Sequence, residues 1–275
     1  MIAMQNPTFF LYDENTAESL RSEELAEFLK GAFAAPVEVR EEFVGRHLGR
    51  WGEEERRGWL EELARRFAYL RVRDVNRENS FSDPLPMEVD VERRRLLNEN
   101  RGSFGMAVDG FQFQACMREL LPVEERGLQH LHIIFTNRLL ATWEADDRRY
   151  HLRTIILGQP AVISTSGLVE APAKPREYYL IRQRLPDDEL ARVNLLRQFA
   201  GRFLEHSDAR TNQVVKGYLM QAAFYLLFGE RFCKDPDCRL FNAHWQEEML
   251  HAQLRPEAGL CEKHEEMVEE LRAKS

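Results

Sequence analysis

The sequence lacks a hydrophobic run long enough to cross a membrane. Its longest apolar stretch, Tyr218 to Phe228, is interrupted only by Gln221. This is far shorter than the stretch of about 20 residues that a membrane-spanning helix needs. A basic segment followed by an apolar one is also missing from Met1 to Asn15, so no secretory signal is predicted. We therefore expect a cytoplasmic protein that makes no membrane contact.

Positive charge is scarce relative to negative charge. Lys and Arg total 38 against 46 Asp and Glu, which gives a formal net charge of −8. A general nucleic-acid binder usually carries a basic surplus, so this balance argues against one. The 275 residues, 44% of them hydrophobic, are enough to bury a sizeable core in one large domain.

Cysteine is rare, and three of the four cysteines lie in one short stretch. Cys233 and Cys238 form a C-x4-C pair, and Cys261 and His264 form a C-x2-H pair after a spacer long enough for a helix. Two such pairs can hold a tetrahedral zinc ion. Because the protein supplies all four ligands, no position is left for a reactive water, and we expect one structural zinc. The remaining Cys116 is expected to be a small buried hydrophobic residue.

No nucleotide-binding or serine-hydrolase motif is present. The hydroxyl-rich segment Ser164 to Gly167 follows a predicted strand, but neither G-x-G-x-x-G nor G-x-x-x-x-G-K-[ST] surrounds it. No serine lies in a G-x-S-x-G turn. His130 and His132 are expected on the same side of a strand, but no third ligand accompanies them, so we predict no metal there.

The first 40 residues predict a βαβ unit. Thr8–Tyr12 is a short apolar strand, Ser22–Phe33 has apolar residues at helical spacing, and Pro36–Arg40 alternates like a strand. Two strands joined by a helix in this way are usually parallel. The N-terminal part of the chain therefore predicts a sheet with parallel strands.

A polar segment follows this unit. A charged amphipathic helix is predicted at 52–73. Residues 77–101 are polar and carry Pro84 and Pro86, which predicts a loop-rich insertion. The run Arg93–Arg95 within it is expected to be a solvated patch.

The rest of the chain predicts strands followed by helices. Apolar, β-branched segments predict strands at 131–135, 153–157 and 161–164. Helical spacing predicts helices at 175–184, 187–206 and 210–229. The last is apolar almost all round, which is typical of a core helix, and Gly229 is placed to cap its end. The predicted fold class is α/β (α+β), a mixed sheet packed on helices.

In its element order and cysteine spacing, the chain resembles the archaemetzincins, zinc peptidases of the metzincin type. In that family a catalytic helix, written HExxHxxGxxH, is followed by a C-x4-C pair and later by a C-x2-C pair. The resemblance covers roughly residues 125–264 and implies a zincin-like sheet. It also implies that the family's structural zinc is held here, with histidine replacing the last cysteine, by Cys233, Cys238, Cys261 and His264.

We predict a single α/β domain over residues 1–275. No repeat, low-complexity segment or linker divides the chain. Its predicted parts are an N-terminal βαβ unit with a helical and loop insertion (1–120), an archaemetzincin-like sheet and core helix (121–232), and a zinc hook (233–275).

The catalytic residues of the family are missing from the matching helix. Counting back from Cys233 places the first two zinc-binding histidines at Ala222 and Leu226. The third falls at Phe232, and the general-base glutamate falls at Ala223. A catalytic zinc needs histidine ligands and a carboxylate that takes the proton of the bound water. We expect a peptidase scaffold without its catalytic zinc, in which Leu226 and Phe232 fill the former metal cavity.

A second group of candidate ligands lies inside the zinc hook. A short helix is predicted over Arg239–Gln253, and His244, Glu248 and His251 would share one of its faces. An E-x-x-H pair on a helix can bind metal, so a second metal or acid–base site is one interpretation. We prefer the alternative, an exposed helix face that covers the hook.

The predicted function is binding by a catalytically inactive peptidase-like protein. The ligand would be a peptide or protein segment held in extended form along the sheet edge. One alternative is a metal-dependent hydrolase with a relocated active site, built from the second group or from carboxylates of 77–101. The other, nucleic-acid binding, would use four basic residues that acidic neighbours dilute: Arg231, Lys234, Arg239 and Lys263. The sequence indicates no oligomeric state.

Overall fold

The computed structural model describes residues 7–12, 20–80, 82–97 and 106–274. Within these ranges the strands are β1 (Thr8–Tyr12), β2 (Val37–Arg40), β3 (Ala107–Asp109), β4 (His130–Thr136), β5 (Leu139–Glu144), β6 (Arg149–Arg153), β7 (Ile155–Ile156) and β8 (Ala161–Ser164). The helices are α1 (Ser22–Phe33), α2 (Phe43–Leu48), α3 (Glu53–Tyr69), α4 (Pro86–Leu96), α5 (Gly110–Leu120), α6 (Thr165–Glu170), α7 (Arg176–Arg182), α8 (Glu189–Gln198), α9 (Thr211–Phe228), α10 (Gln246–Leu254) and α11 (Glu262–Lys274). A short 3-10 helix spans Val123–Glu125.

The main sheet has the strand order β2-β1-β4-β8-β7. β1 pairs in parallel with β2 and with β4, and β4 pairs in parallel with β8. The edge strand β7 runs antiparallel to β8. The predicted βαβ unit is therefore confirmed, and α1 begins and ends at the predicted residues. The pairing of β1 with β4 joins the N-terminal unit to the later strands in one mixed sheet.

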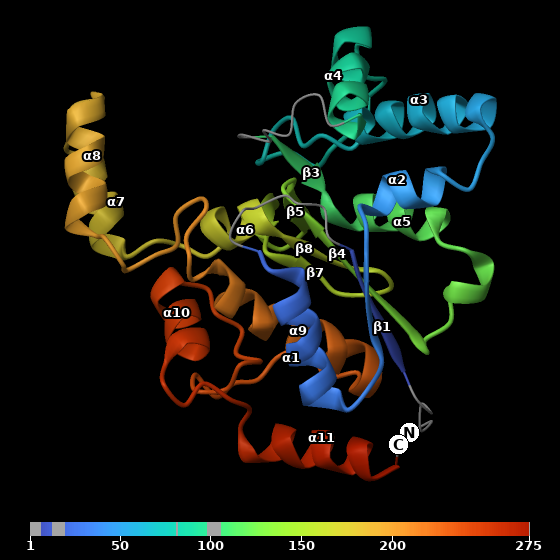
Figure 1. Cartoon of the computed structure of the whole chain (residues 1–275). Helices are drawn as coiled ribbons and strands as arrows, with labels where there is room; N and C mark the ends of the chain where they lie inside the picture. Colours follow the sequence, from blue (N-terminus) through green and yellow to red (C-terminus); the bar gives the residue numbers. More distant parts are fainter. Residues whose placement is uncertain (1–6, 13–19, 81, 98–105, 275) are drawn as a thin grey trace.

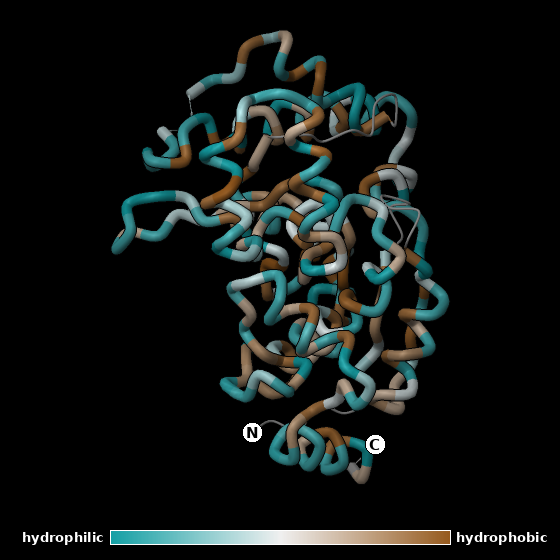
Figure 2. The backbone as a smooth tube through the Cα atoms, turned by 90° about the vertical axis from the view of Figure 1, so that its left-hand side faces the viewer, coloured by the Kyte–Doolittle hydropathy of each residue, from teal (hydrophilic) through white to brown (hydrophobic). Residues whose placement is uncertain are grey.

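Helices cover both faces of the main sheet (Figure 1). α1 and α9 lie on one face, where Phe9, Leu11 and Ile133 belong to one buried core. α2, α3 and α5 lie on the other face, where Phe10 and Ile134 belong to a second core. Alternate residues of a strand face opposite sides of a sheet, which is why neighbouring residues enter different cores. Figure 2 shows the apolar stretches gathered mainly inside the body and the hydrophilic stretches mainly around it.

A second sheet, with the strand order β3-β5-β6, is not among the predicted elements. β3 pairs in parallel with β5, and β5 pairs antiparallel with β6. The sequence signal is weak because β3 is very short and β6 is rich in polar residues. The predicted strand at 153–157 is divided at Thr154: Arg153 ends β6, and Ile155–Ile156 forms β7.

α9 is the long helix at the centre of the fold. Most of its side chains from Thr211 to Phe224 are buried, and it packs against α1, α10 and β4. Gly229 ends the helix with φ 73° and donates its N–H to the Tyr225 carbonyl oxygen at 3.1 Å, as the sequence predicts. The prediction of a core helix is confirmed for this part, whereas Tyr225 to Phe228 are only partly buried.

The predicted loop-rich insertion contains α4, so that prediction is wrong for Pro86–Leu96. Pro86 occupies the first helical position, where a helix needs no backbone N–H. The Glu88 carboxylate accepts the N–H of Leu85 at 2.8 Å and so caps the helix start. α4 then packs against α3. Pro86 is thus a helix-start signal and not a loop signal.

A carboxylate on α4 is buried among arginines. Glu92 is fully buried and lies between Arg71, at 2.8 Å, and Arg138, at 2.6 Å. Arg95 lies 3.3 Å from the same carboxylate and is only 13% exposed. The prediction that Arg93–Arg95 is a solvated patch is therefore wrong for Arg95. Burial would raise the pKa of Glu92, but Arg138 and Arg71 hold that pKa below its ordinary value.

Two helices are shorter than predicted. α8 spans Glu189–Gln198 instead of 187–206, and α10 spans Gln246–Leu254 instead of beginning at Arg239. The chain before α10 is held in extended form by backbone bridges, one from Phe241 to Cys233 and one from Trp245 to Ala173. These bridges explain why the helix begins only after Trp245. α7 and α8 form a hairpin that projects from the body (Figure 1).

A buried hydrogen-bond chain runs beneath the second core. Arg40 Nη1 donates to the Tyr12 hydroxyl at 3.0 Å, and the hydroxyl lies 2.8 Å from His132 Nδ1. His132 Nε2 lies 3.0 Å from the carbonyl oxygen of Glu125. A carbonyl only accepts, so Nε2 carries the proton and Nδ1 accepts from Tyr12. Burial lowers the pKa of His132 to about 4, which keeps this imidazole neutral.

We expect the fold to lose stability as the pH falls from about 6.5 to about 4. An unfolded histidine takes up a proton near pH 6.5, whereas folded His132 resists protonation until about pH 4. The unfolded state binds more protons in this window, which lowers the unfolding free energy by about 2 kcal/mol at pH 5. Denaturant unfolding at neutral and acidic pH measures the loss. An imidazole NMR titration assigns it, and a folded His132 that titrated near pH 6.5 would contradict the prediction.

Candidate metal centre and adjoining cavity

Four candidate zinc ligands converge where the zinc hook folds back on itself. Cys233 and Cys238 lie in the loop after α9, Cys261 precedes α11, and His264 is in the first turn of α11. Their ligand atoms all lie within 4.8 Å of one another. In the part of the chain that the structure describes, no other such group of metal-binding side chains is found. The structure therefore brings together the four predicted ligands, which we call the Cys3His cluster.

The distances inside the cluster suit a tetrahedral zinc ion. Cys233 Sγ lies 3.9 Å from Cys261 Sγ. His264 Nδ1 lies 3.6 Å from Cys238 Sγ and 3.0 Å from Cys261 Sγ. Zinc–sulfur bonds of about 2.3 Å and zinc–nitrogen bonds of about 2.0–2.1 Å, at tetrahedral angles, separate ligand atoms by about 3.5–3.8 Å. The distances from Cys233 to Cys261 and from Cys238 to His264 match closely. The distance from Cys261 to His264 is shorter by about 0.5 Å.

Backbone hydrogen bonds orient the sulfur atoms. The N–H of Asp235 donates to Cys233 Sγ at 3.3 Å, and the N–H of Cys261 donates to Cys238 Sγ at 3.4 Å. Such bonds hold thiolate ligands in position and offset part of their charge. A backbone bridge between Cys238 and Gly259 draws the two ligand pairs together.

Burial shifts the pKa of two side chains in the cluster. It raises the pKa of the Cys238 thiol to about 12 and lowers the pKa of the His264 imidazole. Zinc binds thiolate sulfur and neutral imidazole nitrogen. The His264 ring is therefore already in its ligand form, and a zinc ion would take the place of the proton on Cys238. The donor set and its surroundings fit zinc.

α11, the last element of the zinc hook, contacts α1. Arg272 Nη2 donates to the carbonyl oxygens of Gly31 and Ala32, each at 2.7 Å, at the end of α1. Carbonyls in the last turn of a helix lack partners within that helix, and Arg272 supplies partners here. Val268 of α11 is buried in the same core as α1 and α9. The hook is thus part of the main body and not an appendage (Figure 1).

The second group of predicted ligands is not gathered into a site. His244 precedes α10, so the prediction that it shares a helix face with Glu248 and His251 is wrong. The Glu248 carboxylate accepts the N–H groups of His244 and Trp245, at 2.9 Å and 3.1 Å, and caps α10. His251 Nε2 lies 2.6 Å from Asp237 at the surface. These contacts give the residues structural roles.

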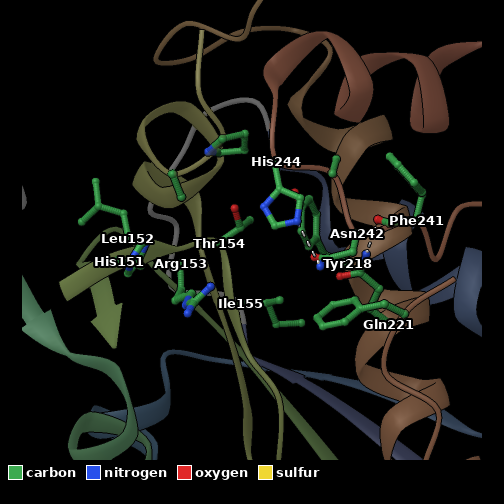
Figure 3. Close-up of a pocket in the computed structure, with 14 residues that line it drawn as sticks. His151, Leu152, Arg153, Thr154, Ile155, Tyr218, Gln221, Phe241, Asn242 and His244 are labelled. Atoms are coloured by element: carbon green, nitrogen blue, oxygen red, sulfur yellow. Dashed lines mark hydrogen bonds between the residues drawn. The ribbon is translucent and has the colours of Figure 1, made fainter. Parts of the chain in front are cut away.

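A cavity of 270 Å³ lies between the edge of the main sheet and α9. Thr154 and Ile155 line it from the strand side, and Tyr218 and Gln221 line it from the helix. Figure 3 shows the two groups of side chains facing each other across the gap. Further lining residues come from neighbouring segments: His151, Arg153, Phe232, Asn242 and His244. The sequence patterns do not predict this cavity, although the polar Gln221 within an apolar run is a signal for it.

One edge of β7 faces β8, and the other edge faces away from the main sheet. The N–H of Ser164 on β8 donates to the Thr154 carbonyl at 2.7 Å, so Thr154 faces β8. Backbone polar groups alternate between the two sides of a strand. Ile155 therefore directs its N–H and carbonyl away from β8, and its side chain lines the cavity.

Residues 5–271 match a protein-family model described as "Probable metallopeptidase family (DUF6775)". The chain belongs to this family. The match extends from before β1 into α11, so the family sequence includes both the main sheet and the zinc hook. Family membership confirms the prediction of a metallopeptidase-like protein. The archaemetzincin subtype stays a prediction.

Among solved structures, this family member is similar to a zinc-dependent peptidase from Methanocorpusculum labreanum (strain Z). The two share 11% sequence identity with a TM-score of 0.40, and the alignment covers 95% of this chain and 99% of that chain. No curated protein matches the sequence. Within the described residues, none of the helices combines the length and the apolar character that a bilayer span requires.

A metallopeptidase family implies a catalytic metal, but the residues of α9 do not fit one. Ala222 and Ala223 are fully buried and carry no side-chain donor atoms, and Leu226 is partly buried. Phe232 is 39% exposed and lines the cavity, and its place in a former metal site stays a prediction. It stays at the surface because it follows the end of α9 at Gly229. This family member therefore lacks metal ligands at the predicted catalytic positions.

Proposed function

We propose that this family member is a peptidase-like protein that binds one structural zinc and no catalytic zinc. The observation that carries the proposal is the composition of α9 and the turn after it. The positions at which the archaemetzincin pattern places three zinc ligands and a general base hold Ala222, Leu226, Phe232 and Ala223. These side chains neither bind a metal ion nor take a proton from water.

The Cys3His cluster is the zinc site in this proposal. Its protein ligands fill a tetrahedral shell, which leaves no position for a reactive water. The ion would join the loop after α9 to the start of α11. Arg272 of α11 donates to the end of α1. The zinc would therefore connect α9 to α1 through α11, and these are the helices that cover one face of the main sheet. The zinc would act as a cross-link between these segments.

We further propose that the ligand is a peptide or protein segment in extended form. The outward N–H and carbonyl of Ile155 provide the backbone groups to which an added strand pairs. The cavity beside Ile155 has 270 Å³, slightly below the range of about 300–1,000 Å³ that is usual for small-molecule pockets. A segment paired with β7 would place a side chain in this cavity.

We do not propose nucleic acid as the ligand. Arg239 is buried and donates to the Ala258 carbonyl at 3.1 Å, and Lys263 pairs with Glu230 at 2.9 Å. These contacts engage two of the four basic residues that a phosphate backbone would need. We propose a cytoplasmic location, where thiols remain reduced and can bind metal.

We expect the protein to bind extended peptides without cleaving them. Replacing Ile155 by proline removes the outward N–H and should weaken binding roughly tenfold, the effect of one hydrogen bond worth about 1.4 kcal/mol. Fluorescence anisotropy with a library of extended peptides measures binding, and gel analysis of denatured casein with added zinc measures cleavage. Ile155→Val, which keeps the N–H, is the matched control.

Two results would refute the proposal. Casein hydrolysis that a chelator abolishes would require a catalytic metal site away from α9. Peptide binding that is equal in Ile155→Pro and Ile155→Val would show that the segment does not pair with β7. Unfolding curves of both variants establish that each is folded before binding is compared.

A further inference from the structure

The cavity beside β7 contains a buried acceptor that lacks a donor. Gln221 is only 3% exposed, and its Nε2 donates to the Phe241 carbonyl oxygen at 3.2 Å. This bond fixes the orientation of the amide, because only the NH2 group can donate to a carbonyl. Gln221 Oε1 has no hydrogen-bond partner among the described residues. Buried polar atoms nearly always have a partner, so this exception points to a missing one.

The position of Gln221 indicates where the missing donor comes from. Gln221 lines the cavity on the helix side, directly across from Thr154 and Ile155 (Figure 3). Its neighbour on the same helix face, Tyr218, already donates its hydroxyl to Met249 Sδ at 3.2 Å. Tyr218 is therefore engaged elsewhere, and a donor that enters the cavity would find Gln221 Oε1 as an open acceptor.

The charged guanidinium on the cavity wall, that of Arg153, is already paired. Arg153 donates to Thr142 Oγ1 at 2.8 Å and forms an ion pair with Glu144. His151 Nε2 lies 2.7 Å from the Asp147 carboxylate but makes no hydrogen bond among the described residues. A carboxylate in the cavity would thus find the Arg153 guanidinium engaged, and it would face the lone pairs of Gln221 Oε1. An ammonium would lose its hydration for one neutral acceptor, which does not compensate an ion for burial.

We propose that the cavity selects an uncharged carboxamide side chain, that of asparagine or glutamine, from a bound extended segment. The NH2 group of the carboxamide would donate to Gln221 Oε1. Its oxygen would accept from the polar rim, where Asn242 and His244 line the cavity. A site built to pair a polar group rejects an analogue that leaves its own groups unpaired. The inference rests on the proposed peptide-binding function for its biological ligand, but the cavity can be tested without a peptide.

The direct test titrates small amides into the isotope-labelled protein. Propionamide is the probe, and propionate and propylammonium are matched charged analogues. We expect saturable shifts of the Gln221 side-chain NMR signals with propionamide and at least roughly tenfold weaker binding of both analogues. Gln221→Met, which keeps side-chain length but removes the acceptor, should weaken propionamide binding roughly tenfold. Gln183→Met, an exposed change on the projecting hairpin, should leave it unchanged.

Three outcomes overturn the inference: no saturable shift with propionamide, equal binding of a charged analogue, or equal binding by Gln221→Met. Folding of Gln221→Met is checked from its amide spectrum, and Gln221→Asn provides a second, polar variant in which a shorter acceptor should retain part of the preference. A peptide series that varies one position on an alanine background completes the test. If no peptide binds but propionamide does, the proposed function fails and the carboxamide site stands. If peptides bind without a carboxamide preference, the inference fails alone.

Discussion

Cys238→Ser should lose its zinc and unfold at a much lower temperature than the parent protein. Cys238 is fully buried, and a serine hydroxyl does not replace a thiolate as a zinc ligand. Zinc present at a thousandfold its dissociation constant contributes about 4 kcal/mol to the folded state. For a chain of this size, the loss of that energy lowers the melting temperature by roughly 8–16 °C. Elemental analysis and thermal unfolding measure the two effects.

Cys116→Ala is the matched control for this experiment. Cys116 is also buried but belongs to the second core, away from the Cys3His cluster. It should keep one zinc per chain and lose only about 1 kcal/mol of stability. Two zinc ions in the parent protein, or a zinc that a chelator removes without lowering the melting temperature, would contradict a single structural zinc.

Glu92→Gln is expected to destabilise the fold by about 3–5 kcal/mol, the usual effect of removing one member of a buried ion pair. The neutral amide would leave Arg71 and Arg138, each 10% exposed, without the carboxylate that lies between them. Repulsion between their like charges would then act at low dielectric. Urea unfolding of the variant and the parent measures the difference.

Asp90→Asn controls for the loss of one negative charge from the same helix. Asp90 is 38% exposed and pairs with Arg93 at 2.6 Å. Exposed pairs contribute at most about 1 kcal/mol, so this variant should be close to the parent. Equal destabilisation by the two substitutions would show that the burial of Glu92 has no special effect.

Elements with strong local signals are predictable from this sequence. α1 has regular apolar spacing and β1 is short and apolar, and these patterns predict both elements at their observed residues. α4 was missed because Pro86 can indicate either a loop or a helix start, and the contact with α3 that decides between them is not local. β3, β5 and β6 depend on pairing between segments far apart in the sequence, which local patterns do not reveal.

Parts of the candidate site are likewise predictable from local sequence patterns, and other parts are not. The spacing of the Cys3His cluster is a chemical requirement and can be read from the sequence. The grouping of His244 with Glu248 and His251 failed because it assumed a helix in a segment that backbone bridges hold extended. The cavity brings Ile155 next to Gln221 through sheet pairing, which only the three-dimensional structure shows.

The contact between Arg272 and the end of α1 has a consequence for synthesis. It joins residues 240 positions apart in the sequence. While the ribosome is still making the middle of the chain, the last carbonyls of α1 cannot receive this donor. The zinc ligand His264 also emerges only shortly before Arg272. Co-translational folding can therefore pair β1 with β2 early. The contact between α11 and α1 can form only after α11 has left the ribosomal exit tunnel.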